Sequence, residues 1–445
     1  MRNKILTTIL LTVLSVVAVY GENINRPKLD SLMNILAEKN KAMGSLTILK
    51  NGNVVYSRAI GYSFLSDKEK IPATEKTIYR IGSISKMFTA TMIFQLIEER
   101  KLKLTTTLDQ YFPNLPNADK ITISNLLNHR SGLHNFTYDP DYVTWMTQPK
   151  TQDEMLSIIA KDKVDFQPNE KASYSNSNFV LLGYIIEKIT KQPYSKNLND
   201  RITSRIGLTN TRYGGKTDLT KNESFSYQFE NTWKQLPETD MSIPGGAGSI
   251  VSTPTDLIQF IEALFSNRFI SHNSLIQMKT ITDGFGMGMF QIPFDTKKAY
   301  GHNGGIDGFA SNLAYFPEDS LAIAYCTNGQ AYPMNDILIG VLSICFDRAY
   351  SIPTFQSRFI SINPDEFTKY AGIYSSTQIP LKITITKNNE TLIAQATGQP
   401  SFPLDAVEKD TFKFDPAGVI LEFNPEKNEM TLKQGGGVFL FKKDL

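Results

Sequence analysis

The segment Thr77-Ile78-Tyr79-Arg80-Ile81-Gly82-Ser83-Ile84-Ser85-Lys86 joins a short extended stretch to a long apolar one, Met87 to Ile97. The apolar stretch predicts a buried central helix. If that helix begins at Ser83, Ser83 and Lys86 lie one turn apart on the same face. An unprotonated lysine amine beside a serine hydroxyl can remove its proton and so create a nucleophile. The segment therefore predicts both the middle of the fold and a candidate catalytic centre.

The start of this helix has a second chemical property. Its free backbone N–H groups and partial positive charge favour an oxyanion formed at Ser83. Ser-x-x-Lys is nevertheless expected by chance roughly once or twice in a chain of this length with average composition, and it occurs once here. A serine at a helix start is also a common N-cap without a catalytic role. A catalytic interpretation of the tetrad therefore requires further motifs in the same chain.

Composition places the chain among ordinary globular proteins. Its 445 residues allow two or three domains, and 41% of them are hydrophobic and 20% charged. A net charge of +2, without an arginine-rich arm, gives no support for nucleic acid or an anionic membrane as a partner. The two cysteines, Cys326 and Cys345, do not make a disulfide framework, and their positions fit either one bridge or two buried free thiols.

The first residues have the pattern of an export signal. Arg2 and Lys4 precede an apolar run from Ile5 to Tyr20, and Gly21 supplies a small residue before a polar stretch. The run is short for a helix that spans a bilayer, although an uncleaved membrane anchor is the alternative. We expect residues 1–21 to be a signal peptide and the mature protein to be periplasmic or secreted, with no stable membrane span.

Residues 22–350 are predicted to form one α/β unit with a helical insertion. Asn51-Gly52 between two apolar runs indicates a β-hairpin over 44–56. Strands return over 309–316 and 321–327, and a helix is expected over 335–346. Because these late elements must pack with the early hairpin, we interpret the mostly helical region 101–270 as an insertion.

Composition changes near residue 350. Two proline-containing segments bracket a predicted linker over 351–364. From 365 to 445, short alternating strands are separated by turns such as Lys387-Asn388-Asn389 and the glycine run 435–437. Regular short strands at this spacing predict a small C-terminal β-barrel or meander.

Two further motifs follow the tetrad. Tyr174-Ser175-Asn176 precedes an apolar helix, and it is either a helix cap or a phenol that shares protons with Lys86 beside an amide that binds substrate. His302-Asn303-Gly304-Gly305 precedes the strand over 309–316. In isolation it is a glycine turn with an exposed histidine, but the Gly305 N–H can serve as a second oxyanion donor. No His, Glu or Cys spacing in the sequence resembles a metal centre.

In this order and at these separations, the three motifs resemble those of the serine β-lactamase and penicillin-binding protein superfamily. The tyrosine of the second motif is similar to the class C β-lactamase branch, with its related esterases and D-alanyl-D-alanine peptidases. Four supporting stretches also resemble that branch: ITISNLLNHRSGL (121–133), GLTNTRY (207–213), GGAGSIVSTPTDLIQF (245–260) and GHNGGIDGFASNLAYF (301–316). The resemblance covers about residues 30 to 350, and the region 365–445 is similar to a lipocalin-like domain.

The resemblance implies an α+β fold in which helices flank an antiparallel sheet. It implies Ser83 as the nucleophile, Lys86 and Tyr174 as the proton-transfer pair, and the backbone N–H groups of Ser83 and Gly305 as the oxyanion hole. The substrate-binding residues that it implies are Asn176, His302, Asn303, Gly304 and Gly305. No cofactor and no metal is implied.

The chain departs from many β-lactamases at His302, where those enzymes have a lysine that faces the carboxylate of the drug. Histidine is only partly charged near neutrality, so the departure favours a peptidase, amidase or esterase. We expect an exported serine hydrolase that forms an acyl-Ser83 intermediate with small-molecule or peptide substrates: D-amino-acid peptides, cell-wall fragments or short esters. Two alternatives stay open, a class C-like β-lactamase and a penicillin-recognising sensor that is acylated without turnover.

Overall fold

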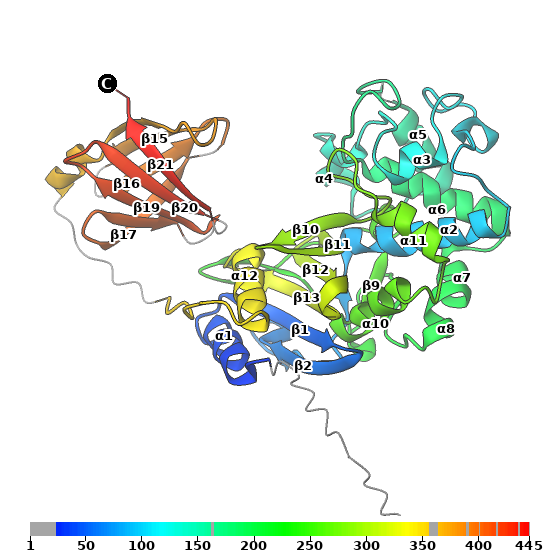
Figure 1. Ribbon diagram of the computed structural model, residues 1–445, viewed down its shortest axis with the longest axis horizontal. Helices are drawn as coiled ribbons and strands as arrows, with labels where there is room; N and C mark the ends of the chain where they lie inside the picture. Colours follow the sequence, from blue (N-terminus) through cyan, green and yellow to red (C-terminus); the bar gives the residue numbers. More distant parts are fainter. Residues whose placement is uncertain are drawn as a thin grey trace, which may run out of the picture.

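The computed structural model describes residues 24–161, 164–355, 364–388, 391–399, 401–414, 417–434 and 437–444. Figure 1 shows a mixed α/β part, coloured blue to yellow, and a set of C-terminal strands, coloured orange and red. The predicted signal peptide (1–21) lies outside the described residues, as do residues 356–363 of the predicted linker. None of the described helices is long and apolar enough to cross a membrane.

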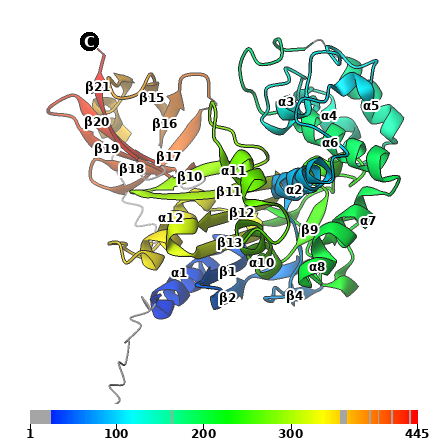
Figure 2. The same cartoon turned by 45° about the vertical axis from the view of Figure 1, so that its right-hand side comes forward.

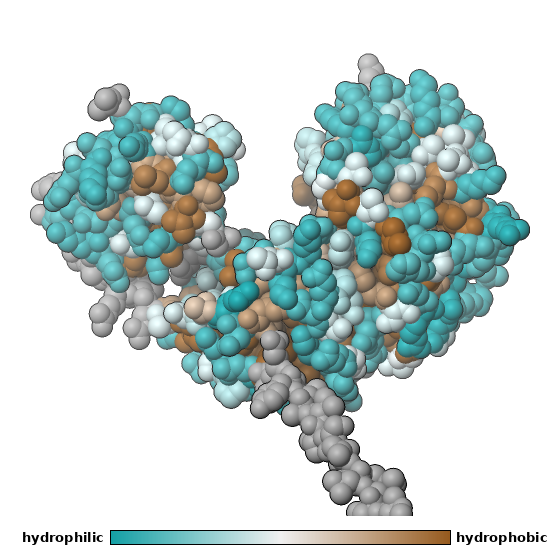
Figure 3. Space-filling model, viewed as in Figure 1, coloured by the Kyte–Doolittle hydropathy of each residue, from teal (hydrophilic) through white to brown (hydrophobic). Residues whose placement is uncertain are grey.

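An antiparallel sheet forms the centre of the α/β part, as the sequence predicts. Its main path runs β10-β11-β12-β13-β1-β2, so the early hairpin is hydrogen-bonded to the late strand β13. The strands of this path are β1 (Ala42–Lys50), β2 (Asn53–Ile60), β10 (Phe290–Phe294), β11 (Lys297–Ile306), β12 (Phe309–Phe316) and β13 (Leu321–Gln330). In the view of Figure 3 the surface is mostly hydrophilic, with apolar residues in separate patches.

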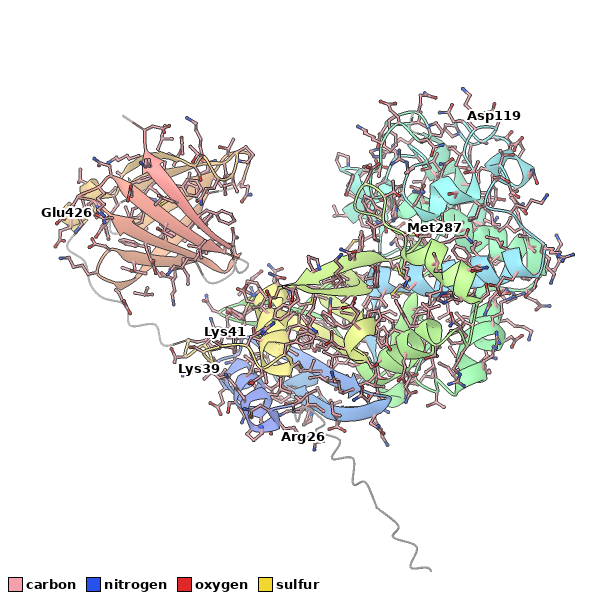
Figure 4. All side chains as sticks on the ribbon, viewed as in Figure 1. Arg26, Lys39, Lys41, Asp119, Met287 and Glu426 are labelled. Carbon is pink, nitrogen blue, oxygen red and sulfur yellow. The ribbon has the colours of Figure 1, made fainter. Side chains whose placement is uncertain are left out.

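Helices cover both faces of this sheet. On one face lie α1 (Arg26–Glu38), whose first residue is labelled in Figure 4, and α12 (Met334–Cys345). On the other lie α2 (Ser85–Glu98) and α10 (Pro254–Phe265). Strand β1 is therefore buried at every residue except its last. The β1–β2 turn is made by Asn51 (φ 51°) and Gly52 (φ 77°), because two left-handed residues give the twist that a two-residue hairpin needs.

The Ser-x-x-Lys tetrad lies where β5 (Tyr79–Arg80) passes into helix. A 3₁₀ turn over Gly82–Ile84 comes first, so α2 begins at Ser85 and not at Ser83 as the sequence predicts. The left-handed Gly82 (φ 50°) starts the turn, which only glycine adopts at low cost. The predicted burial of the helix is confirmed, since every residue from Ser85 to Leu96 is buried. Figure 2 shows α2 between the sheet and the helical insertion.

The predicted helical insertion is present. Its helices are α3 (Ile123–Leu127), α4 (Tyr142–Trp145), α5 (Gln152–Lys161), α6 (Asn176–Thr190), α7 (Tyr194–Leu198), a π-helical turn (Asn199–Thr203), α8 (Ser204–Ile206) and α9 (Gly245–Gly248), and α11 (His272–Lys279) follows α10. Single 3₁₀ turns occur at Leu108–Gln110, Phe136–Tyr138, Leu219–Lys221 and Pro317–Asp319. Met287 lies between α11 and β10 and packs against the larger core (Figure 4).

Several short strands are not predicted by the sequence. They are β3 (Tyr62–Leu65), β4 (Lys70–Pro72), β6 (Arg212–Tyr213), β7 (Tyr227–Glu230), β8 (Thr232–Gln235) and β9 (Ile250–Ser252). The strands β6, β7 and β8 lie within the region 101–270, which the sequence predicts to be mostly helical. Strands of two to four residues are too short to show the alternation on which sequence prediction depends. The His302 motif also lies within β11 and does not merely precede a strand.

The C-terminal strands form a closed antiparallel barrel, which confirms the predicted β-barrel. A 3₁₀ segment (Pro364–Lys369) leads into β14 (Gly372–Ser375), β15 (Lys382–Asn388), β16 (Thr391–Ala396), β17 (Phe402–Glu408), β18 (Thr411–Phe414), β19 (Val419–Asn424), β20 (Glu429–Gln434) and β21 (Gly437–Lys443). Tyr370, Phe412 and Phe423 pack edge to face or tilted against one another in its core. Cys326, in β13, and Cys345, at the end of α12, are free thiols, the second of the two alternatives.

Candidate active site

Ser83 opens onto a cleft of about 320 Å³, a volume within the range of small-molecule sites. The walls come from the Gly82–Ile84 turn, the segment 136–146, the start of α6, the segment 239–248 and the end of β11. A larger hollow of about 860 Å³ lies beside the C-terminal end of α2. It contains none of the three motifs, and Glu99 and Arg201 in its wall pair with each other. The smaller cleft is therefore the candidate site.

Lys86 is completely buried beneath Ser83. Its Nζ lies 3.0 Å from Ser83 Oγ, 2.8 Å from Asn176 Oδ1 and 2.9 Å from the carbonyl oxygen of Ala247. Burial lowers the pKa of Lys86 well below its usual value, because the ammonium form loses its hydration. A neutral amine has two N–H groups, which the Asn176 and Ala247 oxygens accept, and one lone pair, which then faces the Ser83 hydroxyl. The geometry suits an amine that accepts the serine proton.

Tyr174 is the second group that interacts with the Ser83 hydroxyl. Its phenol group hydrogen-bonds Ser83, and its ring centroid lies 4.9 Å from Lys86 Nζ. Burial raises the pKa of Tyr174, and the hydrogen bond to Ser83 only partly opposes this. The phenol is therefore protonated at neutral pH and can donate a proton, whereas burial favours the unprotonated Lys86 amine, which can accept one. The two pKa shifts run in opposite directions and separate the two roles.

Asn176 is the first residue of α6 and is held from three sides. Its backbone N–H donates to Asn135 Oδ1 at 3.0 Å, and its Nδ2 donates to Thr137 Oγ1 at 3.3 Å. These contacts fix the amide so that Oδ1 faces Lys86. Asn135 and Thr137 are not predicted by the sequence analysis, because each is an ordinary polar residue in a loop and only the fold brings it to α6.

The third motif lies on β11 beside the Ser83 turn. A Cβ atom added to Gly304 would lie 2.0 Å from the Ile81 carbonyl oxygen, and one added to Gly82 would lie 2.8 Å from the Gly305 nitrogen. Only glycines allow the two backbones to approach this closely. Gly305 lines the cleft together with Ser83. The structure thus places Ser83 and Gly305, the two residues whose N–H groups are the implied oxyanion donors, on one cleft.

The resemblance implies His302 and Asn303 as substrate-binding residues, but neither is among the residues that line the cleft. His302 is buried, which corrects the interpretation of an exposed histidine. Its ring packs 4.5 Å from Phe290 and 6.3 Å from Tyr174 between centroids. Burial, with a smaller effect of Lys86, lowers the pKa of His302 to about 3. The Asn303 Oδ1 accepts a hydrogen bond from Asn312 Nδ2 at 2.6 Å on the neighbouring strand.

His129 is a site residue that sequence reasoning missed. It lies within the stretch over 121–133 that resembles the class C β-lactamase branch, but it belongs to none of the three motifs. In the fold, the His129 ring stacks on Tyr174 with 4.5 Å between centroids. Its backbone adopts a left-handed φ of 59°. Histidine is one of the few non-glycine residues enriched in that conformation. A backbone angle is not visible in a sequence, so the available signal was the resemblance of the stretch over 121–133.

Comparison with known proteins identifies the family. The family model described as Beta-lactamase matches residues 33–340, more than half of the chain. The chain belongs to the Beta-lactamase family. This agrees with the fold and with the three ordered motifs that the sequence analysis found. The chain is a serine hydrolase of the β-lactamase-related type.

Relatives within the family include hydrolases of D-amino-acid derivatives. Penicillin-binding protein 4* of Bacillus subtilis (strain 168) is 27% identical over 434 residues, covering 89% of this chain and 93% of that protein. The teichoic acid D-alanine hydrolase of Staphylococcus aureus is 28% identical over 230 residues, 51% of this chain and 55% of that protein. The D-amino acid amidase of Ochrobactrum anthropi SV3, solved with D-phenylalanine, gives a TM-score of 0.63 at 25% identity, covering 72% of this chain and 99% of that one.

Proposed function

We propose that this serine hydrolase is exported and cleaves amide or ester bonds through a covalent acyl-Ser83 intermediate. The observation that carries the proposal is the convergence of the Lys86 amine and the Tyr174 phenol on one hydroxyl in one cleft. The proposed substrates are D-amino-acid peptides, cell-wall fragments or short esters. Support comes from the relatives named for D-alanine hydrolysis and for D-amino-acid amide hydrolysis.

Acylation begins with proton transfer from Ser83 Oγ to the lone pair of Lys86 Nζ. The Oγ–carbon bond forms, the carbonyl π electrons move to oxygen, and the N–H groups of Ser83 and Gly305 stabilise that oxyanion. When the tetrahedral intermediate collapses, the bond from carbon to the leaving nitrogen or oxygen breaks. The Tyr174 phenol donates its proton to the leaving atom, and the Lys86 ammonium then supplies the proton that restores the phenol. Ser83 Oγ is bonded to the acyl carbon at this stage and carries no proton.

Deacylation runs the same proton transfers in reverse, with water in place of the leaving group. A water that enters after the leaving group departs gives its proton to the Tyr174 and Lys86 pair as its oxygen attacks the ester carbonyl. The ester bond to Ser83 breaks, Oγ regains a proton, and the product leaves as a carboxylic acid. Loss of one oxyanion donor typically lowers the rate by a factor of about 10²–10³. Small shifts of β11 relative to Ser83 are therefore expected to lower the rate of hydrolysis.

The test is intact-mass measurement after reaction with a fluorophosphonate or a penicillin. Wild type is expected to gain one adduct and Ser83→Ala none. Ser85→Ala, in the same tetrad but with its Oγ bonded to the Ile250 N–H, is the matched control and retains the adduct. Equal labelling of wild type and Ser83→Ala would contradict the assigned nucleophile.

Turnover separates the proposal from its alternatives. Hydrolysis of a chromogenic cephalosporin much faster than of simple esters would indicate a class C-like β-lactamase. Stoichiometric labelling of Ser83 without turnover of any ester, amide or lactam would indicate a sensor. Export is tested by sequencing the N-terminus of the protein recovered outside the cytoplasm, which is expected to begin at Glu22.

A further inference from the structure

The cleft presents no free positive charge to a substrate. Among the described residues that line it, none is lysine or arginine. Lys86 is buried, and its Nζ is taken up by Ser83, Asn176 and Ala247. His302 is uncharged at neutral pH, because burial lowers its pKa to about 3.

Arg80 lies behind the cleft wall, but it is fully engaged there. Its side chain is 3% exposed. Nη1 donates to the Thr239 carbonyl oxygen (2.7 Å) and Asp307 Oδ2 (3.1 Å), and Nη2 donates to the Gly215 carbonyl oxygen and Glu238 Oε1, both at 3.0 Å. The cation is therefore neutralised by two carboxylates and is not available to a ligand.

The one acidic residue of the cleft wall is neutralised in the same network. The Asp307 side chain is 0% exposed, and its Oδ1 accepts hydrogen bonds from the Thr239 N–H and hydroxyl. A substrate carboxylate brought against this wall would lose its hydration and gain no cation, which is unfavourable. A neutral group would lose little.

Another part of the cleft lining is aromatic and apolar. Phe136 and Tyr142 line the cleft, with 6.0 Å between their ring centroids, and Met146 and Ile306 are also among its lining residues. Trp145 packs edge-on to Tyr142 from behind at 5.1 Å. This wall offers a rigid aromatic surface to a substrate side chain.

We propose that the cleft selects acyl donors whose leaving group has no carboxylate beside the scissile bond, and that Phe136 and Tyr142 bind an aromatic or branched apolar group of the substrate. This proposal rests on the proposed function and restricts its substrates to a smaller class. The preferred substrates are uncharged esters and amides, and peptides with a free carboxylate one residue beyond the scissile bond are poor ones.

A matched pair of thioesters tests the selection against charge. N-acetyl-D-phenylalanine is joined either to mercaptoacetate or to its neutral isostere mercaptoacetamide, and thiol release is followed with a thiol reagent. After correction for the hydroxide-catalysed rate of each thioester, kcat/KM is expected to be at least about tenfold higher for the neutral compound. Equal values, or a preference for the carboxylate, overturn this inference while leaving the acyl-enzyme function intact. Turnover of neither compound, with wild type equal to Ser83→Ala, overturns the proposed function and the inference together.

A charge added to the cleft supplies a second measurement. Met146→Lys is expected to reduce the preference for the neutral thioester at least about threefold through attraction of the carboxylate, whereas Met146→Gln, of similar length and without charge, leaves the preference unchanged. An equal effect of both variants, or no effect of Met146→Lys, contradicts the role of charge.

The aromatic wall is tested with two acyl donors, the neutral thioesters of N-acetyl-D-phenylalanine and N-acetyl-D-alanine. Tyr142→Ala is expected to lower kcat/KM about tenfold for the phenylalanine compound and much less for the alanine compound. Val143→Ala, at the adjacent and 68% exposed position, is the control and is expected to change neither. Equal losses on both donors would show that Tyr142 supports the fold and does not contact the substrate group.

Discussion

The imidazole ring of His129 lies against the phenol ring of Tyr174, with 4.5 Å between centroids and 29° between the ring planes. The Ser175 N–H donates to His129 Nδ1 at 3.1 Å, and the Ser173 N–H donates to the His129 carbonyl oxygen at 2.9 Å. His129 therefore contacts the ring of Tyr174 and the backbone on both sides of it. Burial also lowers the pKa of His129 well below its usual value, so it acts here as a neutral positioning residue.

Two substitutions separate the contacts of His129. His129→Asn keeps an acceptor near Ser175 and tolerates the left-handed backbone but removes the stacked ring, and His129→Phe keeps a ring but removes the acceptor. We expect each to lower kcat for a neutral ester about tenfold or more at unchanged KM, because a small misplacement of a proton donor is costly. His272→Asn, at an exposed histidine, is the control. An increase in KM alone would assign His129 to substrate binding, contrary to this prediction.

The buried pair of Arg80 and Asp307 is expected to stabilise the wall next to Gly305. Arg80→Met leaves the Asp307 carboxylate buried without a cation, which costs about 3–5 kcal/mol of unfolding free energy. Arg80→Met with Asp307→Asn should recover part of this loss. The exposed pair of Arg58 and Asp30 is the comparison, since breaking it by Arg58→Met should cost about 1 kcal/mol or less. Urea unfolding measures all three variants, and equal losses for Arg80→Met and Arg58→Met would refute the prediction.

The neighbouring glycines of β11 are expected to respond differently to alanine. A Cβ on Gly304 would meet the Ile81 carbonyl oxygen and the Ser311 hydroxyl, at 2.0 and 2.4 Å, whereas one on Gly305 has its nearest neighbour at 4.0 Å. Gly304→Ala should destabilise the protein by about 1–3 kcal/mol and lower kcat by about 10² or more as β11 moves away from Ser83. Gly305→Ala should leave the unfolding free energy nearly unchanged. Similar melting temperatures for the two variants would count against the close approach.

The sequence could predict the fold where residues form long or strongly patterned elements. The Asn51-Gly52 hairpin, the helix expected over 335–346 and the barrel strands all have local signals that the structure confirms. The short strands β6 to β9 could not be found, because each is specified by its partner strand and not by its own residues. Similarly, the tetrad predicted that the side chains of Ser83 and Lys86 meet, because residues three apart in a helical turn lie on the same face.

The parts of the site that come from long-range contacts could not be predicted. The Ala247 carbonyl oxygen that binds Lys86 belongs to the short glycine-rich helix α9, 161 residues away, and a backbone carbonyl leaves no trace in residue type. The burial of His302 depends on Phe290, in a strand that the sequence analysis did not delimit. Its uncharged state follows from packing, so a sequence could indicate only that a histidine, and not a lysine, stands there.

Acid sensitivity follows from the burial of His302. Its pKa in the folded protein is about 3, against 6.5 for the free side chain. Above pH 6.5 neither the folded nor the unfolded form binds the proton, and the full stability is present. Below pH 6.5 the unfolded chain takes up a proton that the folded protein excludes, so the unfolding free energy falls as the pH falls toward 3. Between pH 7 and pH 5 this one group should cost about 2 kcal/mol.

The substitution His302→Gln should remove that part of the pH dependence. Both tryptophans of the chain, Trp145 and Trp233, lie in the α/β part, so their fluorescence in urea reports the unfolding of this part and not of the barrel. Wild type is expected to lose about 2 kcal/mol more than His302→Gln between pH 7 and pH 5. Each protein is compared with itself at the two pH values, so any overall destabilisation of the variant cancels. The pKa of His129 is lowered mainly by burial and by Lys86 and less by His302, so most of its own pH dependence is common to both proteins and cancels. Equal pH dependences would mean that His302 is protonated as readily in the folded protein as in the unfolded chain, and its burial as a neutral ring beside Tyr174 would then be wrong.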